Sequence, residues 1–312
     1  MKKCVSVLLF IGMFLGSAWG QQINVLKTVV VSDGQTQNFT SPQFSPDGSK
    51  ILFSEAGFKG LWLYDVNLKT IAQINDLPGA GYEPAFTKDG KQIIFRTDNY
   101  IKYKRYSSLA VQTIADKQID YIAKDVRFLS PASVLEDQTI VYRKGNEVAA
   151  YNTSRKEALQ AKAAQETYGF IEDEKIVLVI DGVRKEIKPM GDNNYIWFSL
   201  SPDKTKMLFT VAGGGTFITD LAGNVQVRLG KANAPKWSPD GKWILYMFDE
   251  DDGHTMTASD IWAVTSDGAR KVQLTKTAAD IEMYPVWSPA MDKIVYETFG
   301  GKIAYMNIEI TD

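Results

Sequence analysis

A short motif recurs along this chain and limits its fold more than any other feature. In the clearest copy, Trp237 ends one apolar run, residues 238–241 read Ser-Pro-Asp-Gly, and the apolar triplet Ile244-Leu245-Tyr246 follows. Proline presets φ for the second turn position, aspartate bonds to its own backbone, and glycine adopts positive φ without steric cost. The motif therefore predicts a strand, a tight turn and a second strand.

Related copies run along most of the chain. In four of them the apolar triplet begins four residues after the turn aspartate, and three others are weaker or irregular. Their turn positions are Asp47, Asp89, Asp137, Asp173, Asp203, Asp240 and Asp292. The mean spacing, about 41 residues, is typical of propeller blades with four short strands each. Triplets that are apolar on both faces suit strands enclosed between neighbouring blades.

The repeat predicts an all-β fold, a β-propeller of four-stranded antiparallel blades. Seven apolar triplets favour seven blades. Six is the alternative, because the thin stretch 168–188 can form a three-stranded blade or merge with the preceding one. The last repeat lacks a fourth strand, whereas the β-rich run 22–33 has no repeat of its own. We therefore expect this N-terminal run to complete the last blade and close the ring, which removes exposed sheet edges.

The Trp/Phe-Ser-Pro-Asp-Gly-Lys pattern, with β-rich tails such as residues 260–264 and 270–275, resembles the WD-like repeat of TolB-type β-propellers. It is also similar to the propeller half of dipeptidyl-peptidase-like enzymes. The resemblance covers most of residues 39–311. It implies the propeller fold and, from the TolB-type proteins, protein partners bound at a face of the ring. It does not specify a function, because propellers support many activities on one scaffold.

The N-terminus has the features of an export signal. Lys2 and Lys3 precede a short apolar run, and small residues follow at Ala18 and Gly20. This pattern predicts a signal peptide over residues 1–20, cleaved before Gln21, and a single propeller domain over 21–312. An uncleaved anchor is the alternative, although the run is short for a membrane span. We thus expect a periplasmic or secreted protein with no membrane span after cleavage.

Composition narrows the partners. Cleavage would remove Cys4, the only cysteine, so no disulfide is expected. It would also leave a net charge of about −4 with no basic run, which argues against nucleic acid as a partner. A protein or peptide is the expected partner, and a carbohydrate is the alternative.

Geometry suggests where such a partner binds. In a propeller the first strand of each blade lines the central channel, so residues just before each motif lie near one mouth of it. These are Tyr82, Glu83, Asn194, Tyr195, Asn233, Glu282 and Tyr284. Tyrosine and glutamate around a funnel suit a peptide or a sugar. The alternative is that these groups only hydrate the channel.

Two other stretches are candidates. The insertion 249–260 begins with four acids in residues 249–252 and contains His254, the only histidine. Asp249, Asp251 and Asp252 faintly resemble a calcium loop, although a solvated turn is the alternative. No other cofactor is expected. Residues 100–106 alternate tyrosines with cations, which suits either stacking on a sugar or nucleotide or a half-exposed strand.

Catalytic machinery is hard to assemble from this sequence. No Gly-x-Ser-x-Gly nucleophile elbow occurs, and one histidine cannot form a histidine-rich metal centre. The sequence therefore predicts a non-enzymatic binding protein. The alternative is a carbohydrate-active or metal-dependent propeller, a glycosidase or lyase that uses carboxylates brought together from different blades.

Overall fold

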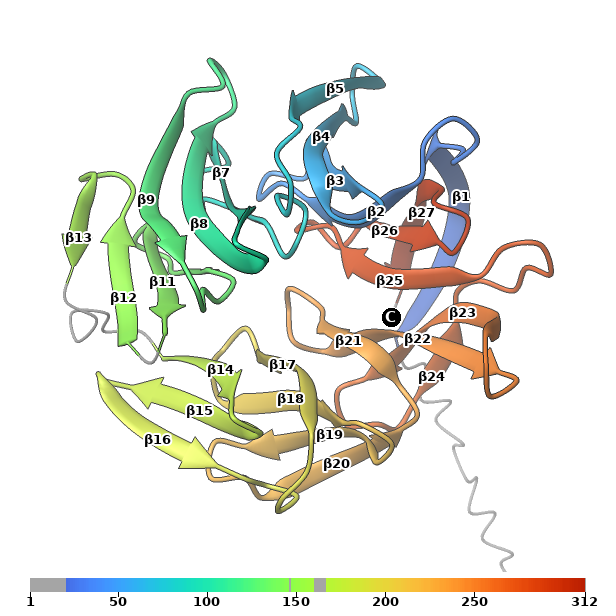
Figure 1. The fold of residues 1–312 in the computed structure, drawn as a ribbon. Coiled ribbons are helices and arrows are strands. Elements are labelled where there is room, and N and C mark those ends of the chain that lie inside the picture. Colours follow the sequence, from blue (N-terminus) through green and yellow to red (C-terminus); the bar gives the residue numbers. More distant parts are fainter. Residues whose placement is uncertain (1–20, 146, 160–166, 312) are drawn as a thin grey trace, which may run out of the picture.

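The computed structural model describes residues 21–145, 147–159 and 167–311, and within them it forms 27 strands and no helix. The strands make seven antiparallel sheets set around a common centre, which is a seven-bladed β-propeller (Figure 1). Six sheets have four strands and one has three. The signal peptide predicted at residues 1–20 lies outside the described residues.

Each blade is a run of consecutive strands, except the last, which also takes in the first strand of the chain. Blade 1 contains β2 (Phe39–Phe44), β3 (Lys50–Glu55), β4 (Lys59–Asp65) and β5 (Thr70–Asn75). Blade 2 contains β6 (Ala85–Phe86), β7 (Gln92–Ile101), β8 (Lys104–Thr113) and β9 (Ile119–Val126). Blade 3 contains β10 (Ser133–Val134), β11 (Thr139–Lys144), β12 (Glu147–Asn152) and β13 (Glu157–Leu159). Blade 4 contains β14 (Tyr168–Glu172), β15 (Lys175–Ile180) and β16 (Val183–Ile187). Blade 5 contains β17 (Tyr195–Leu200), β18 (Lys206–Val211), β19 (Gly215–Asp220) and β20 (Val225–Gly230). Blade 6 contains β21 (Asn233–Trp237), β22 (Trp243–Asp251), β23 (Met256–Thr265) and β24 (Lys271–Gln273). Blade 7 contains β25 (Glu282–Trp287), β26 (Lys293–Thr298), β27 (Ile303–Thr311) and β1 (Gln22–Ser32).

The repeated turn is held by its serine and its aspartate. In blade 1 the Ser45 hydroxyl donates to Asp47 Oδ1 at 2.6 Å and accepts from the Lys50 N–H at 2.9 Å. Gly48 has a φ of 71°, which glycine adopts without strain. The hydrogen bond from Ser45 is the main reason that the pKa of Asp47 falls to about 2. The turn predicted from the motif is confirmed.

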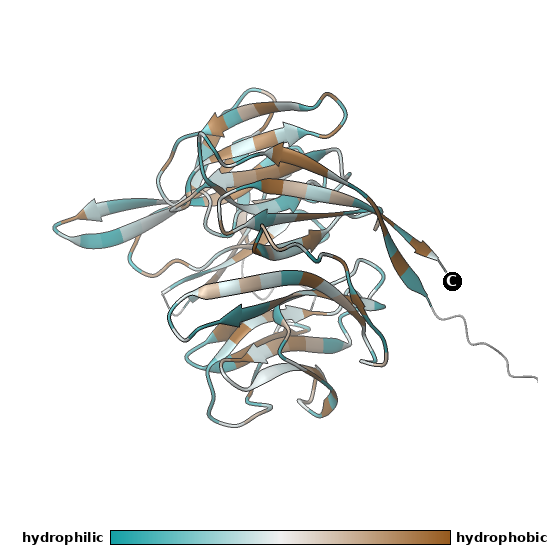
Figure 2. Ribbon diagram, turned by 90° about the vertical axis from the view of Figure 1, so that its right-hand side faces the viewer, coloured by the Kyte–Doolittle hydropathy of each residue, from teal (hydrophilic) through white to brown (hydrophobic). Residues whose placement is uncertain are grey.

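The apolar triplets pack as the repeat predicts. Ile51 and Phe53 of β3 lie in a cluster with residues of blade 7, whereas Leu52 between them lies in a cluster with Phe95 of blade 2. All three triplet residues are fully buried. A triplet thus joins its own blade to both neighbours, and the core of the protein is a ring of such interfaces. Seen from the side, apolar segments lie along the strands and most turns are hydrophilic (Figure 2).

The ring is closed by the N-terminal strand, as predicted. β1 pairs antiparallel with β27, from Gln22 opposite Thr311 to Ser32 opposite Ile303. In Figure 1 the blue β1 lies beside the red strands of blade 7. Ile23 is buried in the same cluster as Ile308. The two ends of the described chain therefore share one sheet.

Blade 4 has three strands, and residues 188–194 connect it to blade 5 without forming a fourth. Pro189 has no N–H to donate to a ladder. The segment is held by the Tyr195 hydroxyl, which accepts from the Met190 N–H at 2.9 Å and donates to the Gly191 carbonyl at 2.8 Å. Blade 4 stays separate from blade 3, which settles the blade number at seven. Because the described residues form strands and turns only, they include no apolar helix of membrane-spanning length.

Candidate functional site

The first strands of the blades lie innermost, around the centre of the ring. Those labelled β2, β14, β17, β21 and β25 lie nearest the centre in Figure 1, and each first strand forms one edge of its sheet. We call the side of the ring on which first strands begin, and on which second and third strands are joined, the mouth face. The opposite side carries the Ser-Pro-Asp-Gly turns and is called the turn face.

Five blades share an unusual backbone at the mouth face. In four of them the register between first and second strands shifts by a bulge. The residue at the shift has positive φ: Ser41 (58°), Trp197 (51°), Ala234 (47°) and Tyr284 (48°), and Glu83 (49°) lies at the equivalent place before β6. Such conformations cost about 1–3 kcal/mol each and cluster at functional sites. Bulges re-aim side chains, here at the rim of the channel.

Tyr82 and Glu83 precede the first strand of blade 2, on the mouth face. Tyr82 is 37% exposed, with its ring edge-on to Phe58 at 5.4 Å. The guanidinium of Arg96 lies 4.4 Å from the ring centre of Tyr82. Arg96 is buried and donates to the Leu129 carbonyl at 3.0 Å. Glu83 is exposed. This part of the rim therefore presents an aromatic ring, supported by a cation, beside an exposed carboxylate.

Tyr284 and Asn233 form a second part of the rim, in blades 6 and 7. Tyr284 is 42% exposed, and its pKa is raised by burial of the hydroxyl and by nearby Glu297 and Asp249. The Asn233 amide donates to Asp249, which also lies 3.7 Å from the Lys231 amine. Asp249 is thus held back against the first strand of its own blade rather than free at the tip of its hairpin.

The remaining three predicted mouth residues are placed differently. Tyr195 is 2% exposed and packs against Phe209 at 5.4 Å, with its hydroxyl bonded to the backbone of the blade 4 connection. Asn194 is exposed, and its carbonyl accepts from Ala212. Glu282 is buried; Thr277 donates to its Oε1 at 2.7 Å, Oε2 has no partner among the described residues, and burial raises its pKa. Tyr195 and Glu282 are therefore buried side chains, whereas Tyr82, Glu83, Asn233 and Tyr284 are at least partly accessible.

Lys236 is a channel residue that the sequence motif did not single out. It is the fourth of the five residues of β21 and lies opposite Leu245, which is buried in the interface with blade 7. The Lys236 residue is exposed, yet desolvation lowers the pKa of its amine, opposed only by Glu83 from across the ring. Both properties suit a side chain on an innermost strand, which has other blades around it. No described carboxylate forms an ion pair with this amine.

Glu297 is another residue that the sequence motif did not single out. It is buried between blades 7 and 1. Both of its oxygens lie 2.9 Å from the Thr40 hydroxyl, and Oε2 accepts from the Ser41 N–H at 2.5 Å. Burial outweighs these donors and raises the pKa of Glu297 to about 7. Because its acceptors are occupied by the neighbouring blade, Glu297 holds the bulge of β2 in place rather than facing a ligand.

The acidic hairpin of blade 6 uses its carboxylates locally. Asp251 accepts from the Gly253 N–H at 2.9 Å, and Asp252 accepts from the N–H groups of His254 and Thr255 at 2.9 and 2.8 Å. Across the described ranges, no three acidic, histidine or cysteine side chains converge as metal ligands would. Metal binding by Asp249, Asp251 and Asp252 stays a prediction.

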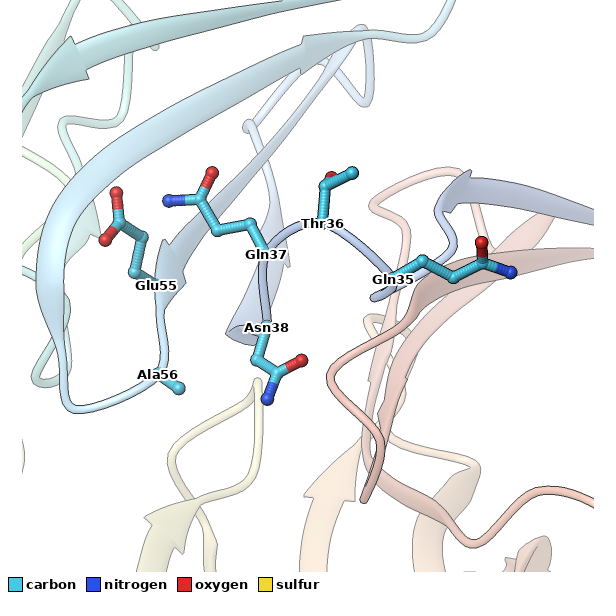
Figure 3. A pocket seen from close by; sticks show the side chains of 6 residues that line it. All are labelled: Gln35, Thr36, Gln37, Asn38, Glu55 and Ala56. Carbon is cyan, nitrogen blue, oxygen red and sulfur yellow. The ribbon is translucent and has the colours of Figure 1, made fainter.

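A polar surface pocket of about 320 Å³ lies beside the seam between blades 7 and 1. It is lined by Gln35, Thr36, Gln37, Asn38, Glu55 and Ala56. Gln37 points toward Glu55, whereas Asn38 points away from them (Figure 3). The amide of Asn38 lies against the carbonyls of Gly34 and Gly300, which ties the closing segment to the last blade. The pocket is open and lies outside the channel.

Fold and rim together define a seven-bladed β-propeller with an aromatic and charged channel mouth. Among solved structures, it is similar to TolB from Acinetobacter baumannii, with 16% identity, 76% of this chain and 54% of that chain covered, and a TM-score of 0.48. It is also similar to an oligogalacturonate lyase in complex with manganese, with 11% identity, 86% and 77% covered, and a TM-score of 0.50. The chain thus spans about half the length of that TolB. No family model and no curated protein matches the sequence. Likeness at these identities shows the β-propeller fold, and the similarity to dipeptidyl-peptidase propellers stays a prediction.

Proposed function

We propose that this chain is an exported, non-enzymatic TolB-like propeller that binds a protein or peptide partner through the mouth face. The observation that carries the proposal is Lys236, a cation on the innermost strand of blade 6 with no ion-pair partner among the described residues. Tyr82 and Tyr284, both partly exposed at the rim, supply aromatic contact area around it. A desolvated amine favours a partner that brings a carboxylate, because a charge-assisted hydrogen bond is stronger in a water-poor site.

Export to the periplasm or the exterior is part of this proposal and rests on the charged and apolar pattern of residues 1–20. A non-enzymatic role is supported by how the buried carboxylates are used. Glu297 is bonded to the neighbouring blade, and Glu282 lies within its own blade interface, so neither faces the channel mouth as a paired acid and base would.

The test is a selection of short random peptides against the full-length chain, followed by titration calorimetry of the selected sequences. We expect enrichment of Asp and Glu, and a loss of affinity of about 10-fold or more in Lys236→Met. Lys242→Met, on the turn face, is the matched control and should bind as the parent does. Tyr284→Ala should weaken binding without changing the acidic preference.

Two results would contradict the proposal. One is peptides selected equally well by the parent and by Lys236→Met. The other is turnover of an oligosaccharide or peptide that disappears in a carboxylate variant such as Glu282→Gln, which would favour the alternative of a carbohydrate-active or metal-dependent enzyme. Misfolding is excluded by thermal melting, because removing a desolvated cation should leave the stability of Lys236→Met unchanged or higher.

A further inference from the structure

The hairpin of blade 2 is, with that of blade 6, one of the two longest at the mouth face, and its tip carries large exposed apolar side chains. β7 and β8 have ten residues each, and their ladder continues to Ile101 opposite Lys104. At the tip Tyr103 is fully exposed, Tyr100 is 67% exposed and Ile101 is 44% exposed. Large apolar side chains that stay exposed on a projecting hairpin add little to the core, so the fold alone does not account for them.

Cations surround this tip. Lys102, Lys104 and Arg105 are exposed on the hairpin, and Lys124 and Arg127 are exposed beside it at the end of β9. Within residues 99–106 and 121–128 these five cations face one acid, Asp125. Asp98, at the base of the hairpin, has a largely buried side chain; it accepts from the Ser107 hydroxyl at 2.5 Å and forms an ion pair with Arg105 at 4.0 Å.

Arg127 is held in place by a backbone carbonyl and two aromatic rings, and none of these neutralises its charge. Arg127 donates to the Arg105 carbonyl at 2.6 Å, and its guanidinium lies 5.4 Å from the ring centres of Tyr106 and Phe128. Phe128 is itself 69% exposed. The surface therefore combines exposed aromatic and aliphatic groups with an excess of exposed cations, of which Arg105 is paired with Asp98, and we call it the cationic hairpin.

Shape decides which partner suits this surface. A projecting tip with a fully exposed side chain offers no groove for an acidic peptide. A lipid interface is deformable and receives a convex tip. Tyrosine is favoured at the headgroup level, aliphatic groups enter the acyl boundary, and lysine and arginine pair with anionic headgroups while their stems cover apolar surface.

We propose that the cationic hairpin docks the propeller onto an anionic phospholipid surface, with Ile101 and Tyr103 at the headgroup boundary and Lys102, Lys104 and Arg105 on the phosphates. Blade 6 carries the acidic hairpin of Asp249–Asp252 on the same face, about half a ring away. An anionic surface repels it, so the docked ring is tilted with blade 2 lowest and the channel mouth open to solvent.

The experiment is cosedimentation of the full-length chain with vesicles of phosphatidylglycerol and phosphatidylcholine in about equal parts, or of phosphatidylcholine alone. All variants keep residues 1–20, so this segment is common to them. We expect Lys102→Glu with Lys104→Glu to weaken binding to the anionic vesicles about 10-fold or more, and Ile101→Ser with Tyr103→Ser to weaken it severalfold. Lys91→Glu with Lys242→Glu, on the turn face, changes the net charge equally and should bind nearly as the parent does.

Insertion of the hairpin into the lipid can be followed by the fluorescence of an added tryptophan, because the hairpin itself contains none. In Tyr103→Trp the added emission should shift to shorter wavelength with anionic vesicles and not with neutral ones. Equal binding of the parent to both vesicle types, no binding even at low salt, or hairpin variants that match the turn-face control would overturn the proposal. Binding to poly-glutamate without binding to vesicles would also overturn it and assign the surface to an acidic protein. Thermal melting shows that each variant is folded.

Discussion

Deletion of residues 22–32 should leave a chain that does not fold or that melts more than about 10 °C below the parent. These residues form β1, which covers the edge of β27 over its whole length and completes the last blade. The deletion removes a full ladder of backbone hydrogen bonds and the burial of Ile23, at about 1 kcal/mol per bond and about 2 kcal/mol for the side chain. A loss of at least about 5 kcal/mol is therefore expected, measured by circular dichroism during heating and by urea titration.

Two point variants test whether the ring depends on the packing of β1 or whether β1 is a dispensable terminal segment. Ile23 is 4% exposed and packs in the core of blades 6 and 7, whereas Leu26 on the same strand is 63% exposed. Ile23→Ser should cost about 2–4 kcal/mol and Leu26→Ser less than about 0.5 kcal/mol. Parental stability in the deletion variant would mean that β1 only lies against a ring that is already complete.

The stability of the protein should fall as the pH rises from about 5 to about 8, and Glu297→Gln should remove most of this dependence. The pKa of Glu297 is raised to about 7 from an ordinary value of 4.5, mainly by burial. Between these two values the folded chain keeps the proton that the unfolded chain has lost, so each rise in pH favours unfolding. Above pH 7 both states are ionised and the contribution of this group to stability is absent.

The size of the effect follows from the shift. A difference of this size corresponds to about 3 kcal/mol of stability that is present near pH 4.5 and lost by pH 8. Glu297→Gln should therefore match the parent at low pH and exceed it by up to about 3 kcal/mol at pH 8. Urea midpoints at pH 5 and pH 8 test this, with Glu309→Gln, an exposed site on β27, as the control. A parent and a Glu297→Gln variant with parallel pH profiles would show that Glu297 ionises freely in the fold.

The fold could be predicted because its determinants are local. Ser45, Asp47 and Gly48 make one turn almost by themselves, and the apolar triplet that follows has to be covered on both faces. The vacancy in the last blade and the spare strand at the N-terminus were also visible in the sequence. The exception was blade 4, where the sequence left open whether a three-stranded blade forms or merges with blade 3; the structure shows a separate three-stranded blade with β16 at its edge.

The site was less predictable because it depends on which side chains of each first strand point toward the rim and which point into the core. Tyr195 and Tyr284 both precede a motif, yet one is buried and the other is exposed. Side chains alternate along a strand, and a bulge after Ile196 or Met283 changes which of them reaches the rim. Lys236 was missed because it lies inside the motif, between positions chosen for packing. The signal that could have found the rim is the residue-proline pair three positions before the motif aromatic, as in Glu83-Pro84 and Tyr284-Pro285.

The seam in blade 7 also determines how the ring answers to mechanical load. Gln22 lies opposite Thr311, so the two ends of the strand pair emerge at the same end of the ladder. A force that pulls these two ends apart breaks the backbone hydrogen bonds of the ladder one after another. It does not load all of them at once, as a shearing force would. We therefore expect β1 and β27 to separate at low force when Gln22 and Thr311 are pulled apart, so that blade 7 opens before the other blades.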